Sequence, residues 1–128
     1  MVTFRPFLPP IFICVLALAA CSGLLPPPTP TPSPLVAQGK RVFNAYCSRC
    51  HESSNRSIIV GPSLAGIASR AESRIPGMDA EAYIRDSIMS PMAYTVEGFA
   101  EGTMPESLKD ELSAQDLEAV IAFLLTLE

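Results

Sequence analysis

The residues with the clearest chemical potential in this chain are two cysteines and a histidine in the stretch Cys47-Ser48-Arg49-Cys50-His51. The pattern C-x-x-C-H is the attachment sequence of c-type haem. Its spacing suits that chemistry, because two thiols that add to the two vinyl groups of a porphyrin must lie about one helical turn apart. A histidine directly after the second thiol can then offer an imidazole nitrogen to the iron. We therefore predict one covalently bound haem c, with thioether bonds at Cys47 and Cys50 and with His51 as an iron ligand.

Two other interpretations of the same motif are open. A redox-active dithiol normally follows a strand within a βαβ unit, whereas the sequence around this motif has helical periodicity. A structural zinc ion needs four ligands. The motif offers three, and the chain has a single histidine. Haem attachment therefore accounts for the motif better than either alternative.

A low-spin haem iron needs a ligand on each face, and with the single histidine already used the second ligand is a methionine or the position is open. The methionines beyond the N-terminal segment are Met78, Met89, Met92 and Met104. Met78 and Met89 adjoin a predicted helix, where core packing is the simpler role. Met104 instead lies in a long predicted loop and is followed by Pro105. We predict Met104 as the second iron ligand, with Met92 or an open site as the alternatives.

The first 20 residues have the features of an export signal. Arg5 is a charged start, and residues 11–18 form a short apolar run. The stretch Leu18-Ala19-Ala20-Cys21 then resembles the lipobox of bacterial lipoproteins, in which the cysteine is diacylated and becomes the mature N-terminus. We predict residues 1–20 as the export signal and Cys21 as the lipidation site. This places the protein on the outer face of the bacterial cytoplasmic membrane, on its periplasmic or extracellular side.

An uncleaved membrane anchor is the alternative for this segment. The run from Ile11 to Leu25 has only 15 residues before Pro26 interrupts it, whereas a spanning helix needs about 20. The residues that follow are rich in proline and carry no charge. Proline at this density favours polyproline II and gives a reach of roughly 40 Å. We therefore predict residues 21–34 as a lipidated cysteine with a proline-rich tether, and residues 35–128 as the folded domain.

Hydrophobic periodicity predicts an all-α domain of about four helices. The first is expected over residues 35–46 and a short second one near residues 63–71. Asp79 is a candidate N-cap for a third helix that ends before Pro91. The last helix should begin at the capping-box pattern Ser113-x-x-Asp116. Between the third and last helices we expect a loop without secondary structure, from residue 90 to about residue 112, and a loop of that length is usually functional.

Each long helix should have one buried face. Apolar residues recur at intervals of three and four, which is typical of an amphipathic helix packed on a core. The expected buried positions are Val36, Gly39, Val42, Phe43 and Tyr46 in the first helix, Tyr83, Ile84 and Ile88 in the third, and Leu117, Val120, Ile121 and Leu124 in the last.

The charge distribution excludes one class of partner and leaves another open. The chain of 128 residues has a formal net charge of −4, which argues against nucleic acid as a partner. Basic residues gather around the motif at Lys40, Arg41, Arg49 and Arg56, and acidic residues predominate after Asp79. An ordinary solvated surface is the simpler interpretation of this arrangement.

These motifs together resemble the class I cytochromes c over nearly all of residues 35–128. The resemblance rests on the first helix with Gly39 and Phe43, the Cys47–His51 motif, Gly61-Pro62, Gly102-Thr103-Met104-Pro105 and the C-terminal helix. It implies a small cytochrome c fold in which the first and last helices cross, with Gly39 and Phe43 against Val120, Phe123 or Leu124. It also implies that the carbonyl group of Pro62 orients His51 through its second ring nitrogen, and that Met104 is the distal ligand.

The region around residues 83–99 also resembles domains attached to bacterial respiratory complexes, although Ser90 stands where those domains usually have asparagine. We therefore expect a membrane-tethered monohaem electron carrier, and not an enzyme. Its partners should be redox proteins, such as a respiratory or photosynthetic membrane complex. One alternative is a fixed haem c subunit of a larger membrane oxidoreductase. Another is a gas-binding or peroxidase-like haem protein with an open iron.

Overall fold

The computed structural model describes Met1, Thr3 and residues 31–128. Apart from Met1 and Thr3, the export signal predicted over residues 1–20 lies outside the described residues, as do the lipidation site at Cys21 and most of the tether. Residues 32–128 form one compact unit. Within the described residues no helix is both long enough and apolar enough to cross a membrane.

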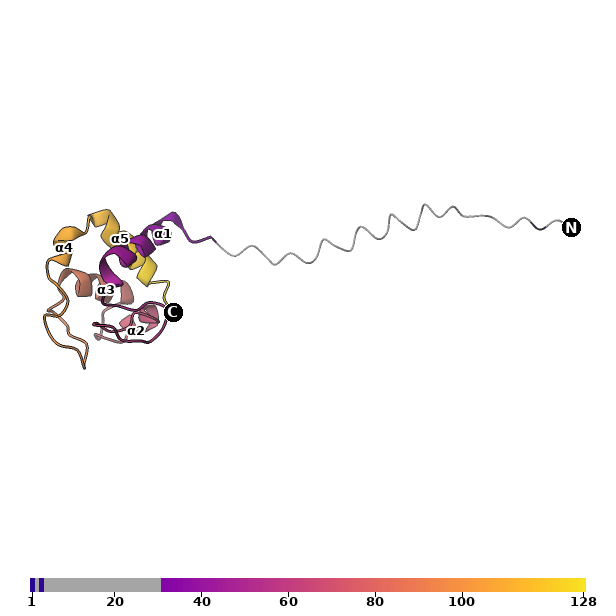
Figure 1. Ribbon diagram of the computed structural model, residues 1–128. Helices are drawn as coiled ribbons and strands as arrows, with labels where there is room; N and C mark the ends of the chain where they lie inside the picture. Colours follow the sequence, from indigo (N-terminus) through magenta and orange to yellow (C-terminus); the bar gives the residue numbers. More distant parts are fainter. Residues whose placement is uncertain (2, 4–30) are drawn as a thin grey trace. The chain divides into compact units, whose positions relative to one another are not determined.

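Residues 31–128 are helical and contain no strand, as the sequence predicts (Figure 1). The helices are α1 (Pro34–Val42), the π-helical turn η3 (Phe43–Cys47), α2 (Ile67–Ala71), α3 (Ala80–Met89), α4 (Leu108–Glu111) and α5 (Ala114–Leu124). The first helix begins one residue earlier than predicted, because the hydroxyl oxygen of Ser33 caps it and Pro34 occupies its first position.

The first and last helices pack directly on each other, and Gly39 makes this possible (Figure 1). A Cβ atom at Gly39 would overlap the carbonyl oxygen of Ala119 and would lie 2.7 Å from Cβ of Phe123. One turn further along, the rings of Phe43 and Phe123 have their centroids 5.5 Å apart. The predicted crossing is therefore present. Gly39 contacts Ala119 and Phe123, however, and Val120 lies beside them in the core.

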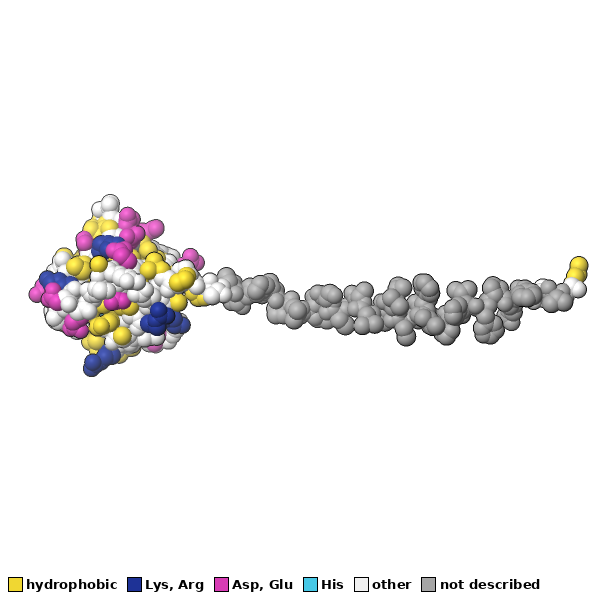
Figure 2. All heavy atoms as spheres, turned by 90° about the horizontal axis from the view of Figure 1, so that it is seen from above, with side chains coloured by type: hydrophobic (Ala, Val, Ile, Leu, Met, Phe, Trp, Pro, Cys, Tyr) yellow, Lys and Arg dark blue, Asp and Glu magenta, His cyan; other side chains and the backbone are white. Residues whose placement is uncertain are grey.

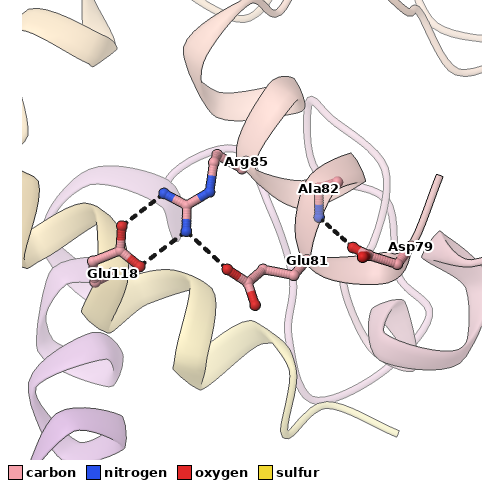
Figure 3. Close-up of polar contacts among 5 residues, drawn as sticks. All are labelled: Asp79, Glu81, Ala82, Arg85 and Glu118. Atoms are coloured by element: carbon pink, nitrogen blue, oxygen red, sulfur yellow. Dashed lines mark hydrogen bonds and ion pairs between the residues drawn. The ribbon is translucent and has the colours of Figure 1, made fainter.

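Polar caps and one ion-pair network fix the positions of α3 and α5 (Figure 3). Asp79 caps α3 by accepting a hydrogen bond of 2.8 Å from the backbone N–H of Ala82. Arg85 on α3 donates two hydrogen bonds of 2.7 and 2.9 Å to the carboxylate of Glu118 on α5, and a third of 2.9 Å to Glu81. This bidentate geometry links the two helices on the surface of the domain.

The last helix begins as predicted, with a variation in its cap. The Ser113 hydroxyl group accepts a hydrogen bond of 3.1 Å from the backbone N–H of Asp116. The same hydroxyl group donates a bond of 2.7 Å to the Asp116 carboxylate. That carboxylate also accepts a bond of 3.1 Å from the Gln38 side chain, so that the cap of α5 is tied to α1. These bonds, with Ser113 first and Gln38 second, lower the pKa of Asp116 below its ordinary value.

Two sequence-based expectations were wrong. Tyr46 was expected on the buried face of the first helix, but it is 41 % exposed. The π-helical turn explains this, because the bond from the Ser48 N–H to the Phe43 carbonyl spans five residues and shifts the register of the apolar face. The region 90–112 was expected to lack secondary structure, but it contains α4 and hydrogen-bonded turns at Ala93 and Phe99.

Candidate functional site

The cysteine motif forms a tight helical turn at the end of η3. The backbone N–H groups of Cys50 and His51 both donate to the carbonyl oxygen of Cys47, each at 3.0 Å. Cys47 and Cys50 are both partly buried and neither is in a disulfide. Burial, with a smaller contribution from the Cys50 thiol, raises the pKa of Cys47 to about 11. The two thiols are therefore spaced by one helical turn.

His51 is held in one orientation by the loop that passes across it. Its Nδ1 atom lies 2.8 Å from the carbonyl oxygen of Pro62. Because a carbonyl oxygen only accepts hydrogen bonds, Nδ1 is the donor, and Nε2 of the neutral imidazole is the nitrogen that can bind a metal. Gly61 packs on the imidazole, where a Cβ atom would overlap Cε1 and lie 2.9 Å from Nδ1. The packing of the imidazole on Gly61 therefore leaves no room for a larger residue at this position.

The loop that carries Gly61 and Pro62 is attached to the motif through its backbone. The N–H groups of Val60 and Gly61 donate to the carbonyl oxygen of Cys50 at 3.2 and 2.9 Å. The N–H group of Leu64 donates to the carbonyl oxygen of Glu52 at 2.7 Å. The orientation of His51 is therefore set by backbone hydrogen bonds on both sides of Pro62.

One cavity brings together all five residues that the sequence analysis associated with haem. Its lining includes Cys47, Cys50, His51, Pro62 and Met104. The rest of the wall is mainly apolar and comes from α2, α3, α5 and the region before α4; it includes Leu64, Ile67, Ile84, Ile88, Phe99 and Leu124. A mostly apolar cavity with a few polar groups is the usual form of a cofactor site.

The two candidate methionines differ in their relation to this cavity. Met104 lines it and packs on the hydrophobic core. Met92 is 48 % exposed, and it is absent from the cavity lining. The turn that presents Met104 is shaped by Gly102, which has a φ of +71°, and by a hydrogen bond of 2.9 Å from the Thr103 hydroxyl group to the carbonyl oxygen of Ala100.

A family model described as cytochrome c matches residues 36–128 of this chain. The chain belongs to the cytochrome c family. A search of curated proteins found no match. The family assignment confirms the resemblance and the small all-α cytochrome c fold. It implies a covalently bound haem c and haem-based electron transfer.

The cavity of this cytochrome c domain offers a group suited to each part of haem c. Two thiols one turn apart match the two vinyl groups, and the imidazole of His51 and the thioether of Met104 are both iron ligands in other cytochromes. Arg70 and Arg74 also line the cavity and would offer cations to the carboxylates of a bound haem. In the part of the chain that the structure describes, no group of three or more His, Cys, Asp or Glu side chains is placed to hold a metal ion.

Sequence reasoning did not place Arg70, Arg74 or Tyr83 at the cavity, although it expected Tyr83 on a buried helix face. Arg70 donates to the carbonyl oxygens of Ser63 and Ala65, the first at 2.8 Å, and so braces the segment after Pro62. Desolvation, and then the nearby Arg56 and Arg74, lower the pKa of Arg70. Neither Arg70 nor Arg74 has a local motif that would have marked it. Desolvation also raises the pKa of Tyr83, which lines the same cavity.

Proposed function

We propose that this protein is a membrane-tethered monohaem cytochrome c that carries single electrons between redox proteins outside the cytoplasmic membrane. One observation carries the proposal: both thiols, the chain's single histidine and Met104 line the same cavity. Haem c, when bound, supplies an iron that changes between two oxidation states without making or breaking bonds in a substrate. The chain's own residues supply attachment, axial ligands and an apolar enclosure.

In this proposal each residue has a defined role. Cys47 and Cys50 would attach the single haem, and His51 would bind its iron through Nε2. The Pro62 carbonyl holds Nδ1 of His51 at 2.8 Å, which fixes the ring and raises its strength as a ligand. Met104 would provide the second protein ligand of the iron. A thioether stabilises the reduced state and gives a fairly high reduction potential.

The axial ligation is tested by carbon monoxide. The reduced wild-type protein should keep its visible spectrum when carbon monoxide is added, because Met104 fills the second axial position. Met104→Ala should bind carbon monoxide, and Met92→Ala should behave as the wild type does. A wild-type spectrum that changes at once would indicate an open iron, as in a gas-binding or peroxidase-like protein. If Met92→Ala binds carbon monoxide and Met104→Ala does not, the second iron ligand is Met92.

The membrane attachment is a separate part of the proposal, and the sequence Leu18-Ala19-Ala20-Cys21 supports it. Two acyl chains at Cys21 would anchor the protein stably, whereas one chain would not. The intact mass of the protein extracted from membranes should match a chain that begins at a diacylated Cys21, and Cys21→Ser should lose the acyl groups. A chain that begins at Met1 without acyl groups would contradict the lipid anchor and favour an uncleaved segment.

Whether the protein moves between partners or stays in one complex can be decided by purification. A mobile carrier should separate from membrane oxidoreductases in mild detergent and still accept electrons from them. A haem c subunit that remains with a membrane oxidoreductase in constant proportion would instead support the alternative of a fixed subunit. The redox site described above would serve in either arrangement.

A further inference from the structure

A second hollow of the domain, a shallow groove, lies between α1 and the end of α5. We call it the α1 groove. Its surface is mostly apolar, and it is lined by Pro32, Val36, Ala37, Lys40, Arg41, Asn44, Phe123 and Thr126. The α1 groove shares no lining residue with the haem cavity. A ligand or surface that covers the groove therefore leaves the lining of the haem cavity uncovered.

Two cations lie at the α1 groove. Lys40 and Arg41 are consecutive residues in the last turn of α1, and both are exposed. Within residues 31–128 neither takes part in an ion pair, since the ion pairs found there are made by Arg85. The helix contains no acidic residue, and the first acidic residue of the chain is Glu52. An apolar groove beside two unpaired cations complements a surface that combines hydrocarbon with anionic groups.

The two ends of the domain sequence carry opposite charge. Residues 31–51 contain three basic residues and no acidic residue, whereas residues 79–128 contain two basic and eleven acidic residues. On the face of the domain that Figure 2 shows, acidic side chains are distributed over much of the surface. An anionic surface would repel this acidic part and attract the basic helix α1. The domain therefore has one orientation in which it can approach an anionic surface closely.

The α1 groove begins where the chain enters the domain. Pro32 lines the groove, and the next residue, Ser33, caps α1 by accepting a hydrogen bond of 3.3 Å from the backbone N–H of Val36. Cys21, the predicted lipidation site, precedes Pro32 by only eleven residues. A fully extended chain of that length spans at most roughly 40 Å. A lipid anchor at Cys21 would therefore keep the groove close to the membrane, where a weak attraction acts at high effective concentration.

From these observations we propose that the α1 groove, with Lys40 and Arg41, docks on the anionic phospholipids of the membrane that carries the protein. This inference rests on the lipid anchor in the proposed function. The two cations pair with headgroup phosphates, and the apolar surface of the groove contacts the lipid below them. One basic residue near an anionic membrane strengthens binding by roughly fivefold. That is too little to hold a free domain, but it orients a tethered one and leaves the haem cavity accessible.

The chain has two lysines, and they provide an internal comparison. Lys40 lines the α1 groove, whereas Lys109 is exposed on α4, outside it. The acylated holoprotein is inserted into vesicles of phosphatidylcholine, either alone or mixed with phosphatidylglycerol, and treated with a membrane-impermeant reagent that acylates amines. Mass spectrometry then gives the ratio of modification at Lys40 to that at Lys109. This ratio should be roughly fivefold lower in the anionic vesicles, and high salt should remove the difference.

Two charge reversals that keep both lysines identify the surface. Arg41→Glu should abolish most of the difference between the two kinds of vesicle, because it replaces a cation of the groove by a repelled charge. Arg56→Glu changes the net charge equally at an exposed position outside the groove, and it should preserve the difference. Each variant is compared with itself in the two kinds of vesicle, so that a changed intrinsic reactivity of Lys40 cancels. The same loss in both variants would indicate attraction by net charge alone and would overturn the inference.

Further outcomes separate this inference from the proposed function. Wild-type protein that sediments with both kinds of vesicle but shows equal ratios in them would overturn the docking and leave the lipid anchor intact. Low reactivity of Lys40 in both kinds, increasing as the protein is diluted on the vesicles, would assign the groove to a second copy of the chain. Protein that sediments with neither kind would contradict both the anchor and the docking. Haem oxidation by hexacyanoferrate(III) is measured on the same samples, and its absence would contradict the electron-transfer function alone.

Discussion

Replacing Gly39 by alanine tests the closest contact in the fold. The added Cβ atom would overlap the carbonyl oxygen of Ala119 and approach Cβ of Phe123 to 2.7 Å. A backbone carbonyl cannot rotate away, so α1 and α5 must separate. Overpacking of this kind costs typically about 1–3 kcal/mol, and a rigid backbone obstacle places the cost at the upper end. Alanine restores about 1 kcal/mol through its helix propensity. The net loss in the free energy of unfolding should be about 2 kcal/mol.

The measurement is thermal unfolding of the holoprotein followed by circular dichroism. A loss of about 2 kcal/mol corresponds to a decrease in Tm of about 8–16 °C for a domain of this size. The control is Lys40→Ala, which changes the next residue of the same helix on its exposed side and should alter stability by less than about 0.5 kcal/mol. A Gly39→Ala protein that is as stable as the wild type would refute the close packing of the two helices.

Further predictions concern the imidazole, the distal ligand and acid stability. Gly61→Ala should push on the imidazole at 2.9 Å from Nδ1, and should therefore shift the reduction potential measured by voltammetry; an unchanged potential would contradict the contact. Met104→His should lower the potential by about 0.1–0.3 V with a low-spin spectrum retained, whereas Met92→His should leave it unchanged. Arg85 lowers the pKa of Glu118 below its ordinary value of 4.5. As the pH falls, Glu118 is therefore protonated in the unfolded chain before it is protonated in the folded protein. The free energy of unfolding decreases until the pH has fallen through the pKa of Glu118 in the folded protein. Glu118→Gln should flatten that decrease in denaturant titrations between about pH 5 and pH 3, and an identical pH profile would be evidence against this ion pair.

Local signals explain what the sequence predicted well. Asp79 and Ser113 cap α3 and α5 as expected, because a cap depends on a side chain and on backbone N–H groups two or three residues away. The cysteine motif likewise specifies its own turn. The contact between His51 and Pro62 spans eleven residues, and it was expected only from the family resemblance.

The remaining features depend on long-range geometry that no local pattern encodes. Tyr46 leaves the buried face because a π-helical turn replaces the regular helix before the motif. Arg70 and Arg74 line the cavity because α2 follows the loop across His51, and neither residue has a distinctive spacing. The short helix α4 has no buried residue. It therefore lacks the apolar periodicity by which a helix is normally recognised.

The central claim is that Cys47 and Cys50 attach haem covalently within this cavity. The most direct test is mass spectrometry of the purified protein after denaturation, followed by digestion and sequencing of the haem-containing peptide. We predict that the intact mass includes exactly one haem, and that the peptide with Cys47, Cys50 and His51 retains it through two thioether bonds. Complete removal of the haem by acid acetone, with both thiols left free, would contradict the account.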